Sequence, residues 1–272
     1  MDKNENQKSL SRREFLRRIG MGAGSALALS ALGPLRALAQ DDKREVVQNR
    51  MTYRVQHGSG EQISLLGFGM MRLPDDQDEV NELVDYAIEH GVNYFDTAPM
   101  YMGGRSEVLT GNALSRHPRD KYFIATKMSN QRNNLWDFEE ARNMYYQSFQ
   151  RLKVDHIDYY LLHSIGNGGM ETLNGRFFDN HLRGGAFGKM AEELTNQLKA
   201  VRPDDSTARW AFRWVGSHPN ILTTLSGMNK MEHLKENVKT FSPLEICTEK
   251  ENALLEEIAD QMARIVELLR KR

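Results

Sequence analysis

At 272 residues the chain suits one large domain plus an appendage, because single β/α barrels commonly run to about 250 residues. The composition, 40% hydrophobic and 27% charged, is that of an ordinary globular protein. The net charge of −1 is uneven: residues 1–39 carry seven Lys and Arg against three acidic residues, a net of +4, which leaves −5 for the rest. We therefore expect no nucleic-acid partner.

A single cysteine, Cys247, limits the metal and redox chemistry of the chain. It excludes an internal disulfide, and it excludes a zinc or iron–sulfur site ligated by several cysteines of one chain. We therefore expect no iron–sulfur cluster and predict no metal site.

The first forty residues have the pattern of an export signal. The segment Ser11–Leu16 (SRREFL) resembles the twin-arginine motif, and the run Ile19–Leu35 is apolar but rich in Gly, Ala and Ser. This run is shorter than the roughly 20 residues of a membrane span, and Ala37–Ala39 has the small-x-small form of a signal-peptidase site. We predict that residues 1–39 are a signal peptide cleaved before Gln40, that the twin-arginine export machinery is a partner, and that the mature protein is periplasmic.

A short hairpin and then a strand–helix alternation follow. Tyr53–Val55 and Ile63–Leu65 flank the turn residues Gly58–Gly60 and predict the hairpin. The expected parallel strands are Leu65–Met71, Asn93–Thr97, Lys121–Lys127 and His156–His163. The expected helices between them are Glu79–His90, Glu107–Leu114 and Trp136–Leu152.

Intervals of roughly 30 residues between these strands indicate parallel strands joined by helices. The pattern fits half a barrel or an open doubly wound sheet. Gly67-Phe68-Gly69 lacks the third glycine of a dinucleotide-binding fingerprint, which favours the barrel.

Four polar residues follow the predicted strands at their carboxyl ends, where the active sites of parallel barrels form. They are Asp96, Tyr101, Lys127 and His163. A free phenol has a pKa near 10, and a neighbouring ammonium held by a carboxylate lowers it, so that the phenol can act as a general acid. We therefore expect Lys127 to lower the pKa of Tyr101, and His163 to orient a carbonyl oxygen.

These residues carry a resemblance to a known family. Asn93–Tyr101 (NYFDTAPMY), with Ser106-Glu107 after it, resembles the aldo-keto reductase signature, and Ala125–Lys127 and Leu161–His163 resemble its next two markers. The resemblance implies a (β/α)8 TIM barrel and a catalytic tetrad of Tyr101, Asp96, Lys127 and His163, with Tyr101 as proton donor.

The resemblance resumes nearer the C-terminus. It implies a further helix at Ser206–Val215, a last strand at Ile221–Met228 and a helix opening at Met231–Asn237. It also implies cofactor-binding residues at the mouth of the barrel. These are Gly69, Met70, Met71, Leu182, Gly184, Gly185, Ser226, Gly227, Met228, His233 and Asn237.

The barrel predicted in this way is incomplete. Only eighteen residues separate His163 from Leu182, where a full barrel would place strands 5–7, so that roughly 70 residues are missing at about 30 per unit. A natural deletion, an error in the gene model, or a partner that completes the sheet would each explain the gap. We assign residues 40–248 to a truncated barrel and residues 249–272 to a charged C-terminal helix.

The leading hypothesis is an oxidoreductase that reduces a small carbonyl substrate, an aldehyde or ketone, with NADP(H) or NAD(H). The alternative is an impaired barrel that serves only as a binding or partner-dependent protein. Gly227 and His233 stand where NADPH-preferring members of the family carry Lys and Arg, so the choice of cofactor stays open. Unpaired barrel edges would also favour self-association.

Overall fold

The computed structural model describes residues 50–129, 138–163 and 192–270, with side chains as far as residue 262. The chain divides into two compact units, Met1–Val47 and Gln48–Arg272. The first unit, and with it the predicted signal peptide, lies outside the described residues.

The predicted hairpin is present near the start of the second unit. Strand β1 (Tyr53–Val55) pairs antiparallel with β2 (Gln62–Ser64), with Tyr53 opposite Ser64. The hairpin supplies Ile63 to a small apolar cluster that also contains Tyr94 and Ala125 of the main sheet.

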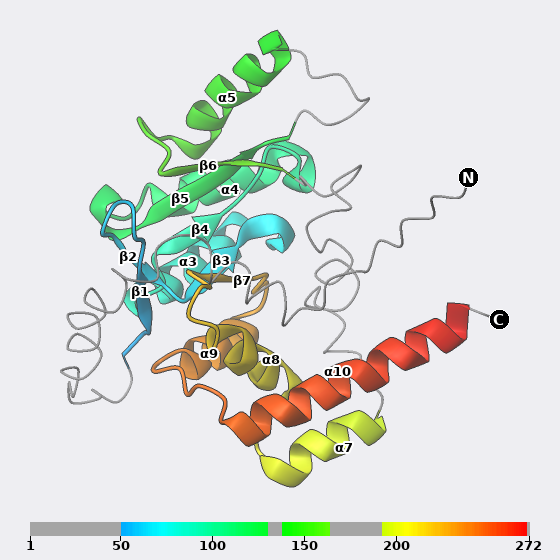
Figure 1. Ribbon diagram of the computed structural model, residues 1–272. Helices are drawn as coiled ribbons and strands as arrows, with labels where there is room; N and C mark the ends of the chain where they lie inside the picture. Colours follow the sequence, from blue (N-terminus) through cyan, green and yellow to red (C-terminus); the bar gives the residue numbers. More distant parts are fainter. Residues whose placement is uncertain (1–49, 130–137, 164–191, 271–272) are drawn as a thin grey trace, which may run out of the picture. The chain divides into compact units, whose positions relative to one another are not determined.

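The main sheet has five strands in the order β6-β5-β4-β3-β7, and every pairing in it is parallel (Figure 1). The strands are β3 (Leu66–Gly69), β4 (Tyr94–Asp96), β5 (Phe123–Met128), β6 (Tyr159–Leu162) and β7 (Thr224–Ser226). The predicted α/β class with parallel strands is confirmed. Strands β6 and β7 form the two edges of this sheet, so the barrel is not closed, as the short spacing after His163 predicts.

Helices follow the strands as the alternation predicts. They are α3 (Gln77–Glu89), α4 (Arg105–Leu114), α5 (Phe138–Leu152), α7 (Glu192–Val201), α8 (Thr207–Gly216), α9 (Met231–Thr240) and α10 (Glu249–Arg270). Short 3-10 helices are η1 (Met70–Arg72), η2 (Tyr101–Gly104) and η3 (Arg119–Lys121). Helix α7 is an element that the sequence patterns did not predict.

Several strands are shorter than predicted, for local reasons. The predicted strand Leu65–Met71 ends at Gly69 because the chain turns there into η1. The predicted strand His156–His163 begins only at Tyr159, since the Asp158 carboxylate accepts the Ile124 backbone N–H at 2.7 Å. The predicted strand Ile221–Met228 is reduced to Thr224–Ser226, the three residues that pair with β3.

Helix α3 shows how the sequence sets an element in this fold. The Asp76 side chain accepts the backbone N–H groups of Asp78 and Glu79 and caps the amino end. Its residues Val80, Leu83, Val84 and Ala87 recur at helical spacing, and all four are buried. Gly91 follows with a φ of +87°, the left-handed conformation in which helices commonly end.

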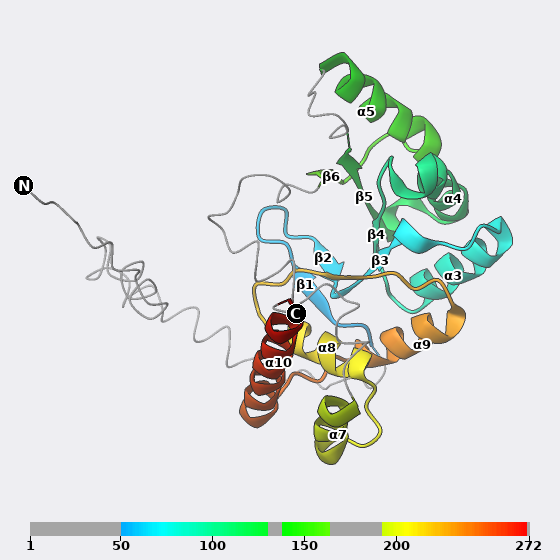
Figure 2. The same ribbon diagram turned by 90° about the vertical axis from the view of Figure 1, so that its right-hand side faces the viewer.

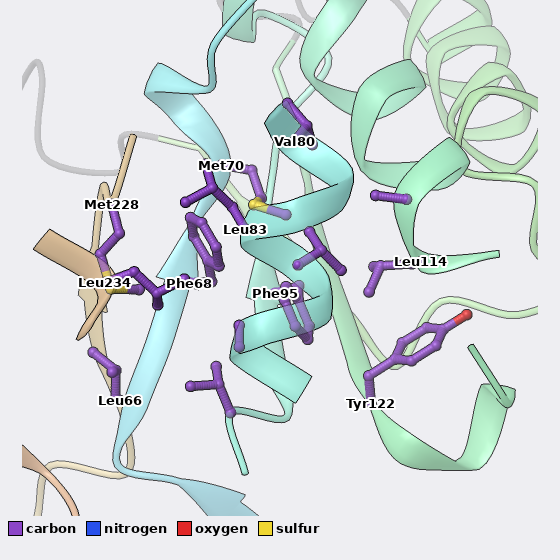
Figure 3. Packing of buried hydrophobic residues seen from close by; sticks show 14 of the residues in the cluster. Leu66, Phe68, Met70, Val80, Leu83, Phe95, Leu114, Tyr122, Met228 and Leu234 are labelled. Carbon is purple, nitrogen blue, oxygen red and sulfur yellow. The ribbon is translucent and has the colours of Figure 1, made fainter. Parts of the chain in front are cut away.

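The larger core lies between the sheet and helices α3, α4 and α9. Phe68 and Phe95, from neighbouring strands, have ring centroids 6.1 Å apart and pack with Leu83 of α3 (Figure 3). Helices α7, α8 and α10 lie near one another (Figure 2). A separate apolar cluster joins them around Trp210, which is fully buried.

Side-chain alternation along the strands decides which residues face the helices. Phe95 and Ile124 belong to the helix-facing core, whereas their neighbours Tyr94 and Ala125 belong to the cluster on the opposite face. Because strand side chains alternate with a period of two, Asp96 and Lys127 share the second face with Tyr94 and Ala125. This face is the interior of a barrel of this type.

Candidate active site

The Asp96–Lys127 pair forms the buried centre of the site. Asp96 is the last residue of β4, and Lys127 lies in the neighbouring strand β5. The Lys127 ammonium donates hydrogen bonds to the Asp96 carboxylate and, at 2.7 Å, to the Thr97 backbone oxygen. The residues are 2% and 8% exposed, so the pair is shielded from water.

Burial acts on both partners of this pair. It raises the pKa of Asp96 and lowers the pKa of Lys127, because a dry environment disfavours either charge. The attraction between the two groups opposes both shifts. We infer from the direct hydrogen bond that they remain an ion pair at neutral pH.

Tyr101 is the first residue of η2, within the segment that connects β4 to α4. The Lys127 ammonium nitrogen is 4.9 Å from the centroid of its ring. The next residues, Met102 and Gly103, have φ values of +52° and +67°, and Gly104 follows at +95°. A methionine held in the left-handed region stores backbone strain directly beside the phenol.

The expected lowering of the Tyr101 pKa is wrong. Burial and, second, the negative charge of Asp96 raise the pKa of Tyr101 to about 12. Lys127 does not offset this because its own charge is balanced by the adjacent Asp96. Tyr101 is therefore fully protonated at neutral pH.

His163 follows β6 and completes the group. Its ring meets the Tyr101 ring edge-on, with centroids 5.4 Å apart and planes at 86°. Burial and the nearby Lys127 charge lower the pKa of His163, which keeps the imidazole neutral at pH 7. All four residues predicted as a tetrad are thus brought together at the carboxyl ends of β4, β5 and β6.

The predicted cofactor residues fall into three groups. Gly69 and Gly227 lie beside each other across β3 and β7, and a Cβ at Gly69 would come 3.4 Å from the Ser226 carbonyl oxygen. The Asn237 side-chain amide donates to the Ser226 hydroxyl at 3.0 Å and holds the end of β7. The missing side chain at Gly69 lets the backbone at the end of β7 approach closely.

The second group consists of three methionines and a histidine, of which two are buried and two are about half exposed. Met70 and Met228 are 0% and 1% exposed and belong to the core, so only their backbone could face a cofactor. Met71 is 52% exposed, and the His233 side chain is about half exposed. The third group, Leu182, Gly184 and Gly185, lies outside the described residues.

Sequence reasoning missed a buried polar group behind the site. Glu107 is fully buried, accepts the Thr126 hydroxyl at 2.7 Å, and pairs with the Arg151 guanidinium at 2.6 Å. It ties α4 to β5 and α5. Thr126 directly precedes Lys127 in β5, so its side chain lies on the opposite face of the strand, toward the helices. Strand alternation could therefore have indicated that Thr126 contacts a polar residue of a helix.

The same reasoning also missed Ser129, two residues after Lys127 on the same strand face. Its hydroxyl lies 2.6 Å from the His163 Nδ1 atom. Because strand side chains alternate with a period of two, its place two residues after Lys127 could have indicated that Ser129 faces the site.

The described residues hold no cluster of three or more His, Cys, Asp or Glu side chains placed to bind a metal ion. Within residues 50–129, 138–163 and 192–270, no helix has the length and apolar character needed to span a membrane.

The part of the chain that carries these residues is similar to known proteins. Residues 65–167 match the model of the aldo/keto reductase family. The uncharacterized oxidoreductase YqkF of Bacillus subtilis is 37% identical over 108 residues, which cover 37% of this chain and 35% of that protein. The chain thus spans about a third of the length of this curated relative.

Solved structures show the same fold. The thermostable aldo-keto reductase Tm1743 aligns with a TM-score of 0.61 and 20% identity over 76% of this chain and 100% of its own. An aldo-keto reductase of Klebsiella pneumoniae in complex with NADPH aligns with a TM-score of 0.53 and 17% identity, over 78% of this chain and 95% of its own. Residues 65–167 thus match the aldo/keto reductase family model, and the fold is similar to that of aldo-keto reductases of known structure.

Proposed function

We propose that the protein reduces a small aldehyde or ketone with hydride from NADPH or NADH and a proton from Tyr101. The observation that carries the proposal is the convergence of Tyr101, Lys127, Asp96 and His163 at one end of the sheet. The match of residues 65–167 to the aldo/keto reductase family model supports it. The NADPH complex of the Klebsiella pneumoniae neighbour supports the choice of cofactor class.

Each of the four residues has a distinct task in this proposal. The Tyr101 phenol, protonated at neutral pH, gives its proton to the carbonyl oxygen. The Lys127 ammonium beside the ring stabilises the phenolate that remains, and Asp96 keeps the ammonium charged and in place. Neutral His163 orients the carbonyl oxygen by a hydrogen bond.

The described residues fit a nicotinamide cofactor at the carboxyl ends of β3 and β7. When bound, the cofactor would supply the hydride. Gly69, Ser226 and Gly227, at the ends of these two strands, would hold it through their backbone groups. Leu182, Gly184 and Gly185 complete the proposed set, and the described residues leave NADP and NAD as equal alternatives.

A second function is favoured by the open sheet. Without closure of the barrel, part of the wall that surrounds a cofactor in a closed (β/α)8 barrel has no counterpart among the described strands. The chain would then be an impaired barrel that acts only as a binding or partner-dependent protein.

Titration of the full chain with NADPH and with NADH, followed by cofactor fluorescence, separates the two functions. The reductase predicts saturable binding and an oxidation of the cofactor that depends on added aldehyde or ketone. If neither cofactor bound at millimolar concentration, the reductase would be excluded and the impaired barrel favoured.

We also propose export to the periplasm by the twin-arginine route, from the residues Ser11–Leu16 and Ala37–Ala39. The double substitution Arg12→Lys with Arg13→Lys keeps the charge and alters only the guanidinium groups. It is expected to retain the precursor in the cytoplasm, and unchanged delivery to the periplasm would exclude this route.

A further inference from the structure

Ser129 is a buried polar residue at the site that the proposed mechanism does not use. It follows the last residue of β5 and is 3% exposed. Its backbone N–H points to the Met144 sulfur at 3.3 Å, and its hydroxyl lies 2.6 Å from the Nδ1 atom of His163. A contact this short between a buried hydroxyl and an imidazole constrains the protons of both groups.

We propose that Ser129 is a positioning residue that fixes His163 in the tautomer with its proton on Nε2. The inference rests on the proposed reductase function, because it assigns the donor with which His163 orients the carbonyl oxygen. It concerns a residue that does not itself touch the substrate.

The hydrogen-bond inventory of the pair decides between the two tautomers. Among the described residues, the Ser129 hydroxyl makes one hydrogen bond, and its partner is the His163 Nδ1 atom. If Nδ1 carried the proton and donated to Ser129, the hydroxyl proton would be buried without an acceptor among the described residues, which is unfavourable. If the hydroxyl donates to Nδ1, the serine proton is satisfied and the imidazole proton must be on Nε2.

This tautomer matters because only one ring nitrogen is left for the substrate. Nδ1 is occupied by Ser129, and Nε2 lies at the opposite edge of the ring. A proton on Nε2 makes it a donor to the carbonyl oxygen, whereas a lone pair there would repel that oxygen. The edge-on contact with Tyr101 at 5.4 Å restrains the ring in addition to the serine.

The tautomer can be read without any enzymatic activity. Long-range proton–nitrogen correlation spectra of the full chain, labelled with ¹⁵N-histidine, distinguish protonated from unprotonated ring nitrogens, and a His163→Asn variant assigns the signal. We expect Nε2–H in the parent, a mixture of tautomers in Ser129→Ala, and Nε2–H again in Ser129→Thr. An Nδ1–H tautomer in the parent would overturn the proposal even if neither variant folds.

The role of Ser129 in the reaction is tested by measuring kcat for the same two variants. Their thermal unfolding midpoints show whether they are folded. Losing one neutral hydrogen bond that orients His163 should lower kcat about two- to tenfold in Ser129→Ala, with cofactor affinity unchanged and the rate restored in Ser129→Thr. A tautomer shift without any change in kcat would overturn the positioning role. A parent without carbonyl reduction would refute the proposed function, while the spectra would still decide the tautomer.

Discussion

The pKa values of Tyr101 and Lys127 are shifted in opposite directions from their ordinary values. The pKa of Tyr101 rises to about 12 through burial and the charge of Asp96, while burial lowers the pKa of Lys127 below 10.5. On raising the pH, the Lys127 ammonium therefore loses its proton before the Tyr101 phenol does. The alkaline limit of activity is therefore expected to be set by the deprotonation of Lys127 and not by that of Tyr101.

We predict that kcat/KM falls on the alkaline side below pH 10.5, because neutral Lys127 no longer stabilises the phenolate of Tyr101. Lys127→Arg keeps a positive charge above this range, since the guanidinium pKa exceeds 12. The variant should therefore move the alkaline limb upward, toward the pKa of Tyr101. A limb that stays at the same pH in Lys127→Arg would assign it to another group.

Asp96→Asn is predicted to lower the free energy of unfolding by about 3 kcal/mol, because it leaves the Lys127 ammonium buried without its partner. The matched control is Asp75→Asn, which breaks an ion pair to Arg105 whose side chains are 79% and 56% exposed. Such exposed pairs contribute about 0–1 kcal/mol. Equal losses in the two variants, measured by urea unfolding, would contradict the importance of the buried pair.

At the scale of elements, the sequence predicted the strands, and the strand ends that carry the candidate site, better than it predicted the pKa values of the site residues. The spacing of Asp96, Lys127 and His163 after apolar runs places them correctly, because parallel strands end at one edge and side chains alternate. The pKa of Tyr101 could not be predicted in this way, since it depends on burial and on the balance between Lys127 and Asp96.

The packing of α4 against the end of α5 depends on one glycine. A Cβ at Gly111 would lie 2.4 Å from the Arg151 carbonyl oxygen and 2.7 Å from the Leu152 Cα atom. Because these are backbone atoms, they cannot rotate away. The sequence pattern gave no warning, as glycine in a helix usually signals only lower stability.

Gly111→Ala is predicted to lower the free energy of unfolding by about 1–2 kcal/mol, since overpacking outweighs the gain of about 1 kcal/mol in helix propensity. Gly58→Ala is the control, because its Cβ would meet only the flexible Gln56 side chain. We expect little change there. A stabilised Gly111→Ala variant would mean that α4 and α5 are not packed as closely as described.

At the scale of the whole second unit, the open sheet is the feature that departs from a closed barrel. The edge strands β6 and β7 expose apolar residues, with Leu161, Leu162 and Leu225 at 37%, 53% and 46% exposure. Unpaired strand edges with exposed apolar side chains favour association with other strands. Among the described strands, part of the wall against which a cofactor would pack in a closed barrel has no counterpart.

We predict that light scattering shows a molar mass that rises with the concentration of the chain, and that calorimetry gives NAD(P)H affinities weaker than micromolar. Leu162→Lys should shift the protein toward the monomer by placing a charge on the β6 edge. Ile246→Lys is the control, because Ile246 is 64% exposed and lies outside the sheet. A stable monomer that binds the cofactor with micromolar affinity would contradict this prediction.

The most direct test of the central claim compares Tyr101→Phe with the parent chain in carbonyl-dependent oxidation of NADPH and NADH, at saturating cofactor. Phenylalanine keeps the ring over Lys127 and removes only the proton that Tyr101 donates. We predict a loss in kcat of about 10²- to 10⁴-fold, the usual contribution of a general acid, with unchanged cofactor affinity. A Tyr101→Phe variant that turns over as fast as the parent would show that Tyr101 is not the proton donor.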